Sequence, residues 1–258
     1  MATKNVVPDK TSMLRAFDLL QEYNESVIND LEKRFPQSDW RIIDSFTARR
    51  CINIHRMFNT LRSLLIPNYD DCSINALLRS LADHIASLLL IYSGSTKDEI
   101  LLRHLLCIAD GITERKETLL SFCRVNNHID VSEQEHVLNE CEEYIRLCPL
   151  YPEHKNRIER LLTKHNWKYK SLASGESYKW SELYRDILKL NNDYVEYLSQ
   201  YVHGLAGSVL SSNKNDVSRA TAICIACYLN MKFSLFIWDI CQIRPPDVLT
   251  NTLNELIR

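Results

Sequence analysis

The chain has 258 residues, of which 45% are hydrophobic and 25% are charged, as in an ordinary soluble globular protein. It contains only 5 glycines and 7 prolines, which favours long helices over strands joined by turns. The formal net charge of -2 excludes a uniformly basic protein, so a nucleic-acid partner would have to bind a local patch.

The N-terminal third of the chain predicts a tail followed by two helices. Residues 1–10 lack the apolar core of a signal peptide, and we expect them to be a frayed tail. Apolar spacing predicts helices over residues 11–35 and 38–65, each ended by a proline. The second helix has a basic flank of Arg49, Arg50, Arg56 and Arg62. We interpret this flank as a solvated face rather than as a nucleic-acid surface.

Residues 73–94 predict a buried helix that carries charged groups. Its apolar residues recur at steps of three and four, the period of one helix face. Arg79, Asp83 and His84 lie among them. Burying a charge without a partner costs several kcal/mol. These side chains therefore satisfy one another, satisfy another helix, or belong to a site.

Helix geometry separates two of these possibilities. Arg79 and Asp83 are four residues apart, so they share a helix face and form a charge-assisted pair. Arg79 and His84 are five residues apart, which places them roughly 140° apart around a straight helix. We therefore expect Arg79 and His84 not to meet unless the helix breaks.

The middle third of the chain predicts three further helices. They cover residues 96–125, residues 132–148, and a short stretch that ends near residue 165. The first two begin with the spacing of a capping box. Arg103 falls in the apolar half of the first.

Residues 166–180 form the one long irregular segment that we expect. The segment interleaves tryptophans and tyrosines with Lys168 and Lys170. Such side chains could stack on bases and bind phosphates. The alternative, which we favour, is an ordinary loop pinned to the rest of the protein by its aromatic rings.

The C-terminal third predicts two long helices and a short tail. The first runs from residue 181 to about 205, and Ser199 and His203 share a flank of its apolar stripe. The second covers residues 217–242 and precedes an amphipathic tail. Its apolar run approaches membrane-spanning length, but Asn230, Lys232 and Asp239 interrupt it. A charge near a bilayer centre costs roughly 2.5 to 3.5 kcal/mol, so we interpret the run as a core helix and predict no membrane partner.

The nine cysteines are an odd number, scattered mostly through helical patterns, which suggests a reducing cytoplasm. Cys224 and Cys227 form a C-x-x-C pair, yet no second Cys or His pair stands at metal-ligand spacing. We therefore predict packed thiols, and neither a metal nor a cofactor.

Two stretches, ALLRSLADHIASLLLIY and YVEYLSQYVHG, resemble motifs of an uncharacterised family of bacterial all-helical proteins grouped with the HEPN-like domains. The resemblance covers residues 73–204. The family typically has R-x-x-x-E in the first motif, and this chain has Asp83 at the acidic position. Ser199 and His203 match the S-x-x-x-H of the second motif.

The resemblance implies a helical bundle that is often dimeric and, in active members, a metal-independent endoribonuclease that uses R-x(4–6)-H. Such proteins commonly act as toxins or in defence against phage. The implied catalytic candidates are Arg79, Asp83, His84 and His203. The candidates for substrate binding are Arg103, Ser199, Lys168 and Lys170.

One other interpretation of the same residues stays open. Arg79 and Asp83 could be a structural pair that bridges to Ser199 or His203, within a helical binding or scaffold module. A DNA-binding helix-turn-helix is disfavoured, because no short basic recognition helix stands out.

We predict an all-α, cytoplasmic, bacterial protein that folds as an antiparallel bundle of about eight or nine helices with a HEPN-like core. One domain is expected over residues 11–258, with its core bundle over residues 38–243. The expected partners are RNA, a second copy of the chain, or a partner protein such as an antitoxin or another defence component.

Overall fold

The computed structural model describes residues 10–66, 69–93, 96–122, 130–202, 216–247 and 249–251. These residues are mainly helical and contain no strand, which confirms the all-α prediction. The chain divides into two compact units, one of Met1–Leu88 with Tyr184–Arg258 and one of Leu89–Leu183. The single domain, the HEPN-like core and the antiparallel bundle stay predictions.

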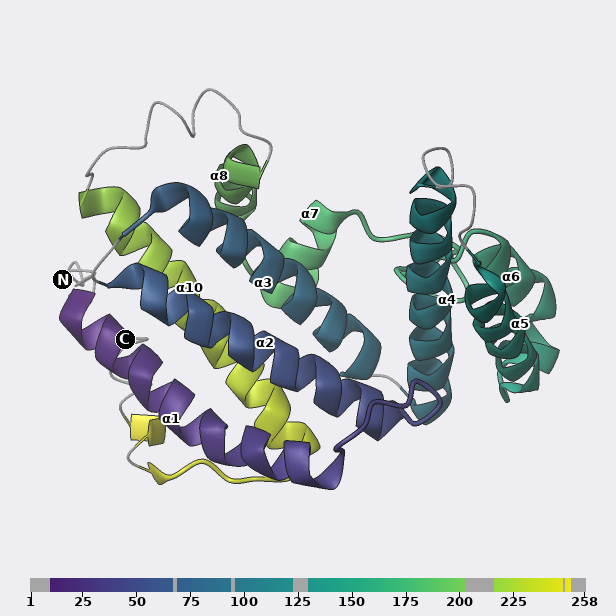
Figure 1. Ribbon diagram of the computed structural model, residues 1–258, viewed down its shortest axis with the longest axis horizontal. Coiled ribbons are helices and arrows are strands. Elements are labelled where there is room, and N and C mark those ends of the chain that lie inside the picture. Colours follow the sequence, from purple (N-terminus) through teal and green to yellow (C-terminus); the bar gives the residue numbers. More distant parts are fainter. Residues whose placement is uncertain are drawn as a thin grey trace. The chain divides into compact units, whose positions relative to one another are not determined.

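In the first unit, α1 (Lys10–Arg34), α2 (Ile43–Leu65) and α10 (Asp216–Ile240) lie side by side around a shared apolar core (Figure 1). Phe58 of α2 is fully buried, and its ring centroid is 5.9 Å from that of Phe17 on α1 and 5.8 Å from that of Phe233 on α10. Apolar residues occupy several faces of α10, most of them buried, although Leu235 on this helix is 50% exposed.

The polar contacts between these helices fix their directions. On α1 and α10, Met13 contacts Cys224, whereas Asn24, further along α1, donates to Ser234 at 2.8 Å. The paired residue numbers rise together, so α1 and α10 run parallel. Arg62 of α2 pairs with Asp18 of α1, and Arg56 pairs with Glu32, so α2 runs antiparallel to α1. Antiparallel packing therefore holds for α1 and α2, which are neighbours in sequence, but not for α1 and α10.

The first unit also contains α3 (Asp71–Tyr92) as far as Leu88, a π-helical turn η1 (Tyr184–Leu188), and α8 (Asn192–Val202). The prediction of one long helix over residues 181–205 was wrong. The backbone leaves the helix at Lys189, whose φ is 58°, and restarts at α8. Because a left-handed residue cannot continue a right-handed helix, η1 and α8 are separate elements.

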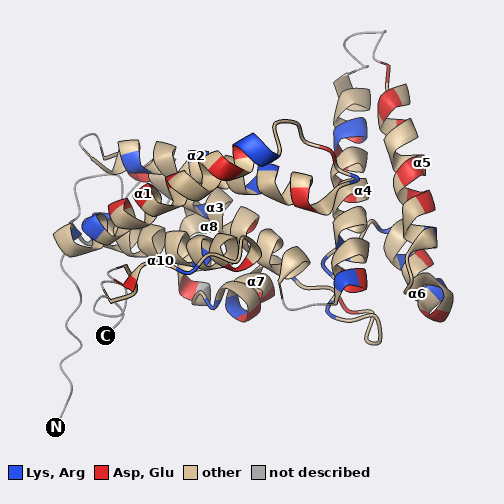
Figure 2. Cartoon of the chain, turned by 90° about the horizontal axis from the view of Figure 1, so that it is seen from below, with Lys and Arg blue, Asp and Glu red and all other residues tan. Residues whose placement is uncertain are grey.

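The second unit contains α4 (Lys97–Phe122), α5 (Ser132–Leu147), α6 (Tyr151–Thr163) and the short α7 (Trp180–Leu183). Helices α4 and α5 pack antiparallel, because Lys116, late in α4, pairs with Glu135, early in α5, whereas Cys148, just after α5, contacts Asp98 O at the start of α4. Figure 2 shows that α5 carries acidic residues along its length. One pair across this contact joins Lys116 Nζ to Glu135 Oε1 at 2.7 Å.

Local hydrogen bonds account for where the helices begin. At α4, the Glu99 N–H donates to Thr96 Oγ1 at 3.2 Å, as the capping-box spacing predicted. The prediction was wrong at α5, where Ser132 lies inside the helix and its N–H donates to Asp130 Oδ1 at 2.9 Å. Helix α2 begins at Ile43, later than expected, and the Ser45 hydroxyl in its first turn donates to Gln37 O at 2.9 Å.

Two helices of the described part of the chain, Asp71–Tyr92 and Ser218–Ile240, are long and apolar enough to cross a membrane. Of their most apolar windows, 61% and 56% respectively is buried inside the protein. Core helices of soluble proteins have the same length and composition, so this is weak evidence. The expected absence of a membrane partner and the cytoplasmic location stay predictions.

Candidate functional site

Arg79 lies at the centre of a polar cluster in the first unit. Its Nη1 donates to Ser199 Oγ at 2.6 Å, and its Nε lies 3.4 Å from Asp83 Oδ2. Its guanidinium carbon is 4.7 Å from the centroid of the Tyr184 ring. Three elements therefore meet at Arg79: α3, which carries Arg79 and Asp83, the π turn, and α8. We call these four residues the Arg79 cluster.

The local backbone and its hydrogen bonds explain how each side chain of the Arg79 cluster is oriented. Arg79 and Asp83 are one helical turn apart, so they project from the same face of α3. Ser199 is oriented by donating its own hydroxyl to Val195 O at 2.8 Å, which leaves its oxygen to accept from Arg79. Tyr184 begins the π turn and is fully buried. Sequence reasoning did not find Tyr184, because helical periodicity does not foresee a π turn.

Asp83, Ser199 and Tyr184 contact the guanidinium of Arg79 on three sides, but they do not use all of its N–H groups. The side chain is 17% exposed, and its hydrogen bonds to described residues involve only Nε and Nη1. An arginine has five N–H groups in a rigid fork. Among the described residues, the Nη2 group makes no hydrogen bond, so it remains able to donate to an anion.

His84 does not join the Arg79 cluster. Part of its side chain is exposed, yet its pKa lies below the usual value of a histidine. The main cause is removal of water from the ring by the surrounding protein, and the second is the positive charge of Arg50 on α2. No hydrogen bond or ion pair joins His84 to Arg79, Asp83 or Ser199 among the described residues, in keeping with its expected separation from Arg79 around the helix. His203 lies outside the described residues.

The lowered pKa of His84 predicts a pH dependence of stability. The folded protein disfavours the protonated ring, so below a pH of about 6.5 the unfolded chain binds more protons than the folded chain. Acidification from pH 7.5 to 5.5 should therefore destabilise the wild type more than His84→Gln. Thermal melting of both proteins across this range tests it, and parallel curves would contradict it.

Arg103 lies in the second unit, where it fastens the predicted loop to α4. Its side chain is 4% exposed and donates to Tyr169 O at 2.8 Å. Its Nη2 donates to Glu99 Oε1 at 2.9 Å, and the guanidinium stacks 4.0 Å from the centroid of the Tyr169 ring. These contacts give Arg103 a structural role. Arg103 could bind a substrate, as predicted, only if its contacts with Glu99 and Tyr169 broke.

The segment of residues 166–180 is more ordered than an irregular loop. Tyr169 and Ser177 form an isolated antiparallel bridge, and the buried Trp167 donates from Nε1 to Asp110 Oδ2 at 2.9 Å. Gly175, with a φ of 67°, makes the turn, where a side chain would collide with Arg157. The segment is thus pinned by its aromatic residues, as the favoured interpretation expected.

The two lysines of this segment already have partners within the second unit. Lys170 Nζ lies 3.0 Å from Glu182 Oε1, and its hydrogen bond to this carboxylate is the largest cause that raises the pKa of Lys170. Lys168 Nζ lies 4.5 Å from the centroid of the Trp180 ring and 5.6 Å from that of Trp167. Their predicted role in substrate binding stays a prediction.

The basic flank of α2 also has partners. Arg56 Nη2 lies 2.8 Å from Glu32 Oε1, and Arg62 binds both carboxylate oxygens of Asp18. Arg49 Nη2 donates to Pro36 O at 3.5 Å. Several members of the flank therefore tie α2 to α1 or to the chain before it, rather than facing solvent alone.

The cysteine pair of α10 packs against α1. Cys227 Sγ lies 3.0 Å from Met13 O, and burial raises the pKa of Cys224 and, to about 12, that of Cys227. The residues that the structure describes include no group of three or more His, Cys, Asp or Glu side chains that could hold a metal ion. The expected absence of a metal and of a cofactor stays a prediction.

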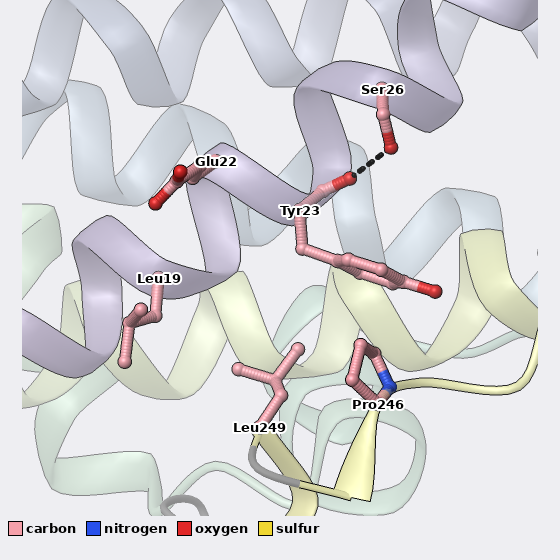
Figure 3. A pocket seen from close by; sticks show the side chains of 6 residues that line it. All are labelled: Leu19, Glu22, Tyr23, Ser26, Pro246 and Leu249. Carbon is pink, nitrogen blue, oxygen red and sulfur yellow. Dashed lines mark hydrogen bonds between the residues drawn. The ribbon is translucent and has the colours of Figure 1, made fainter.

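A pocket of about 360 Å³ lies between α1 and the residues that follow α10 (Figure 3). Leu19, Pro246 and Leu249 give it apolar walls, and Glu22 supplies a carboxylate. None of the predicted site residues that the structure describes is among the residues that line it.

Comparison of the chain with protein-family models, with curated proteins and with solved structures found no match. The HEPN-like resemblance therefore rests on the two sequence motifs and stays a prediction.

Proposed function

We propose that this protein is a HEPN-like, metal-independent endoribonuclease in which Arg79 binds the scissile phosphate. The observation that carries the proposal is the guanidinium of Arg79, held by Asp83, Ser199 and Tyr184 with its Nη2 group unengaged by the described residues. A rigid, partly exposed guanidinium suits the oxygens of a phosphate, which accept two parallel N–H bonds.

The proposed reaction needs a base and a stabilised phosphate. A histidine takes the proton of the 2′-hydroxyl, whose oxygen then bonds to phosphorus. Arg79 stabilises the crowded phosphate as its bond to the 5′-oxygen breaks. The 5′-oxygen takes up a proton from water, and the histidine returns the proton of the 2′-hydroxyl to water. The products are a 2′,3′-cyclic phosphate and a 5′-hydroxyl. Asp83 orients the arginine.

Two histidines are candidates for the base, and we favour His203 from its place in the sequence. Ser199 accepts a hydrogen bond from Arg79, and His203 follows Ser199 by four residues in the sequence. The ring of His84 is instead influenced by Arg50. The resemblance further implies a bacterial toxin or a component of anti-phage defence, cytoplasmic, acting as a homodimer or with a partner protein.

The test is to incubate the purified chain with total RNA and with tRNA in the presence of EDTA. We expect cleavage that leaves 2′,3′-cyclic phosphate ends and that slows about 100-fold or more in Arg79→Ala, because a lost oxyanion donor costs about that much. Arg62→Ala is the matched control, since it removes an arginine from another carboxylate pair.

The melting curve of each variant shows whether it is folded. Absence of cleavage by the folded wild type, or equal cleavage by a folded Arg79→Ala variant, would overturn the proposal. Loss of cleavage in both His84→Ala and His203→Ala would leave the assignment of the base open between them, whereas loss in one alone would identify it.

A second candidate is a non-catalytic helical binding or scaffold module. The same cluster favours it, because Arg79 joins three elements and a buried polar contact of this kind fixes how helices pair. This candidate predicts a marked fall in the melting temperature of Arg79→Ala and no cleavage of RNA by the wild type.

A further inference from the structure

A second polar cluster in the first unit is centred on a buried carboxylate. Asp71, at the start of α3, is 6% exposed. Its Oδ1 accepts from Tyr69 Oη at 2.6 Å and from Ser218 Oγ, on α10, at 2.8 Å. On α8, Tyr197 Oη lies 2.9 Å from Ser218 Oγ and 3.1 Å from Tyr201 Oη. We call these five residues the Asp71 network.

The carboxylate sets the direction of the hydrogen bonds in the network. A serine hydroxyl has one proton, and that of Ser218 goes to Asp71. Tyr197 therefore donates to Ser218, and Tyr201 donates to Tyr197. Burial raises the pKa of Tyr197 to about 12 and also raises the pKa of Tyr69, so both hydroxyls keep their protons at neutral pH. Each hydroxyl on the path from Tyr201 to Asp71 therefore donates its proton toward the carboxylate.

This chain of hydrogen bonds attaches the helix that also carries Ser199. Helix α8 follows the backbone break at Lys189, so it is not a continuation of η1. Among the described residues, α8 is joined to α3 where Ser199 accepts from Arg79 and where Tyr197 reaches Asp71 through Ser218. Tyr197 and Ser199 are two residues apart. A shift of α8 at Tyr197 would therefore move Ser199 relative to Arg79.

We propose that the path from Tyr197 through Ser218 to Asp71, within the Asp71 network, is a latch that holds α8 in place, and that Tyr197 is thereby a positioning residue for Arg79. The catalytic consequence of the latch rests on the proposed function, whereas the attachment of α8 does not. Asp71 and Tyr197 need touch no substrate in this role. They act by keeping Ser199 against the guanidinium that binds the phosphate.

The network supplies its own matched pair of variants. Tyr197→Phe removes the hydroxyl that joins α8 to Ser218, while Tyr69→Phe removes a hydroxyl that donates to the same carboxylate from outside α8. In amide hydrogen exchange of the full chain, we expect peptides from α8 to exchange about five- to tenfold faster in Tyr197→Phe. Peptides from α4 and α5 should not change in either variant. Equal α8 exchange in Tyr197→Phe, Tyr69→Phe and the wild type would overturn the latch.

The catalytic arm uses RNA cleavage by the same variants. We expect Tyr197→Phe to lower kcat more than it changes KM, and Tyr69→Phe to leave both near their wild-type values. Faster α8 exchange without a change in kcat would overturn the positioning role. A wild type that cleaves no RNA would remove the proposed function, and hydrogen exchange would then still decide whether the latch exists.

Discussion

Replacing Arg103 with alanine is expected to destabilise the second unit by about 3 kcal/mol or more. The change removes a cation that is almost fully buried and leaves Glu99 without its ion pair. It also leaves the carbonyl oxygen of Tyr169 without the donor that reaches it at 2.8 Å, and it empties the space over the Tyr169 ring. An uncompensated buried acceptor and a cavity each lower the free energy of unfolding.

Urea unfolding measures this loss, and hydrogen exchange of peptides from residues 166–180 shows where it arises. The matched control is the double variant Glu99→Gln with Arg103→Met, which removes both charges and retains most of the volume. Replacing a whole buried ion pair is often close to neutral, so this variant should recover part of the lost stability. If Arg103→Ala unfolded at the same urea concentration as the wild type, and residues 166–180 exchanged at the wild-type rate, Arg103 would not hold this segment in place.

The helices themselves could be predicted because their apolar residues repeat at the helical period. The expected helix over residues 73–94 appears as α3, and the charged residues within it find partners, as the cost of burying a charge required. The pair of Arg79 with Asp83 and its contact with Ser199 were expected from spacing and from the second motif. Whether these residues catalyse a reaction stays a prediction, because their contacts are compatible with both a structural and a catalytic role.

What could not be predicted depends on contacts between residues far apart in sequence. Asp71 and Ser218 are 147 residues apart, and nothing in either local pattern links them. The parallel pairing of α1 with α10 was missed for the same reason, since short loops dictate directions only between helices that are neighbours in sequence. The break at Lys189 was missed because the apolar stripe continues across it, and a periodic pattern alone does not reveal a single left-handed residue.

Phe58→Ala is expected to lower the free energy of unfolding of the first unit by about 3 to 5 kcal/mol. Phe58 is fully buried, and its ring meets Phe17 edge-on and Phe233 at a tilt. Alanine would leave a cavity where α1, α2 and α10 converge. These helices hold the polar contacts around Asn24 and Ser234 in the same core, so the cavity cannot close without separating those groups.

Urea unfolding followed by circular dichroism tests this prediction, and hydrogen exchange should accelerate in peptides from both α1 and α10. Leu235→Ala is the control, because Leu235 lies on α10 but is 50% exposed, and its truncation should cost less than about 1 kcal/mol. A loss in Phe58→Ala as small as that of the control would show that the three rings do not form the centre of the core. A large loss would show that the place where α1, α2 and α10 meet at Phe58 contributes strongly to the stability of the first unit.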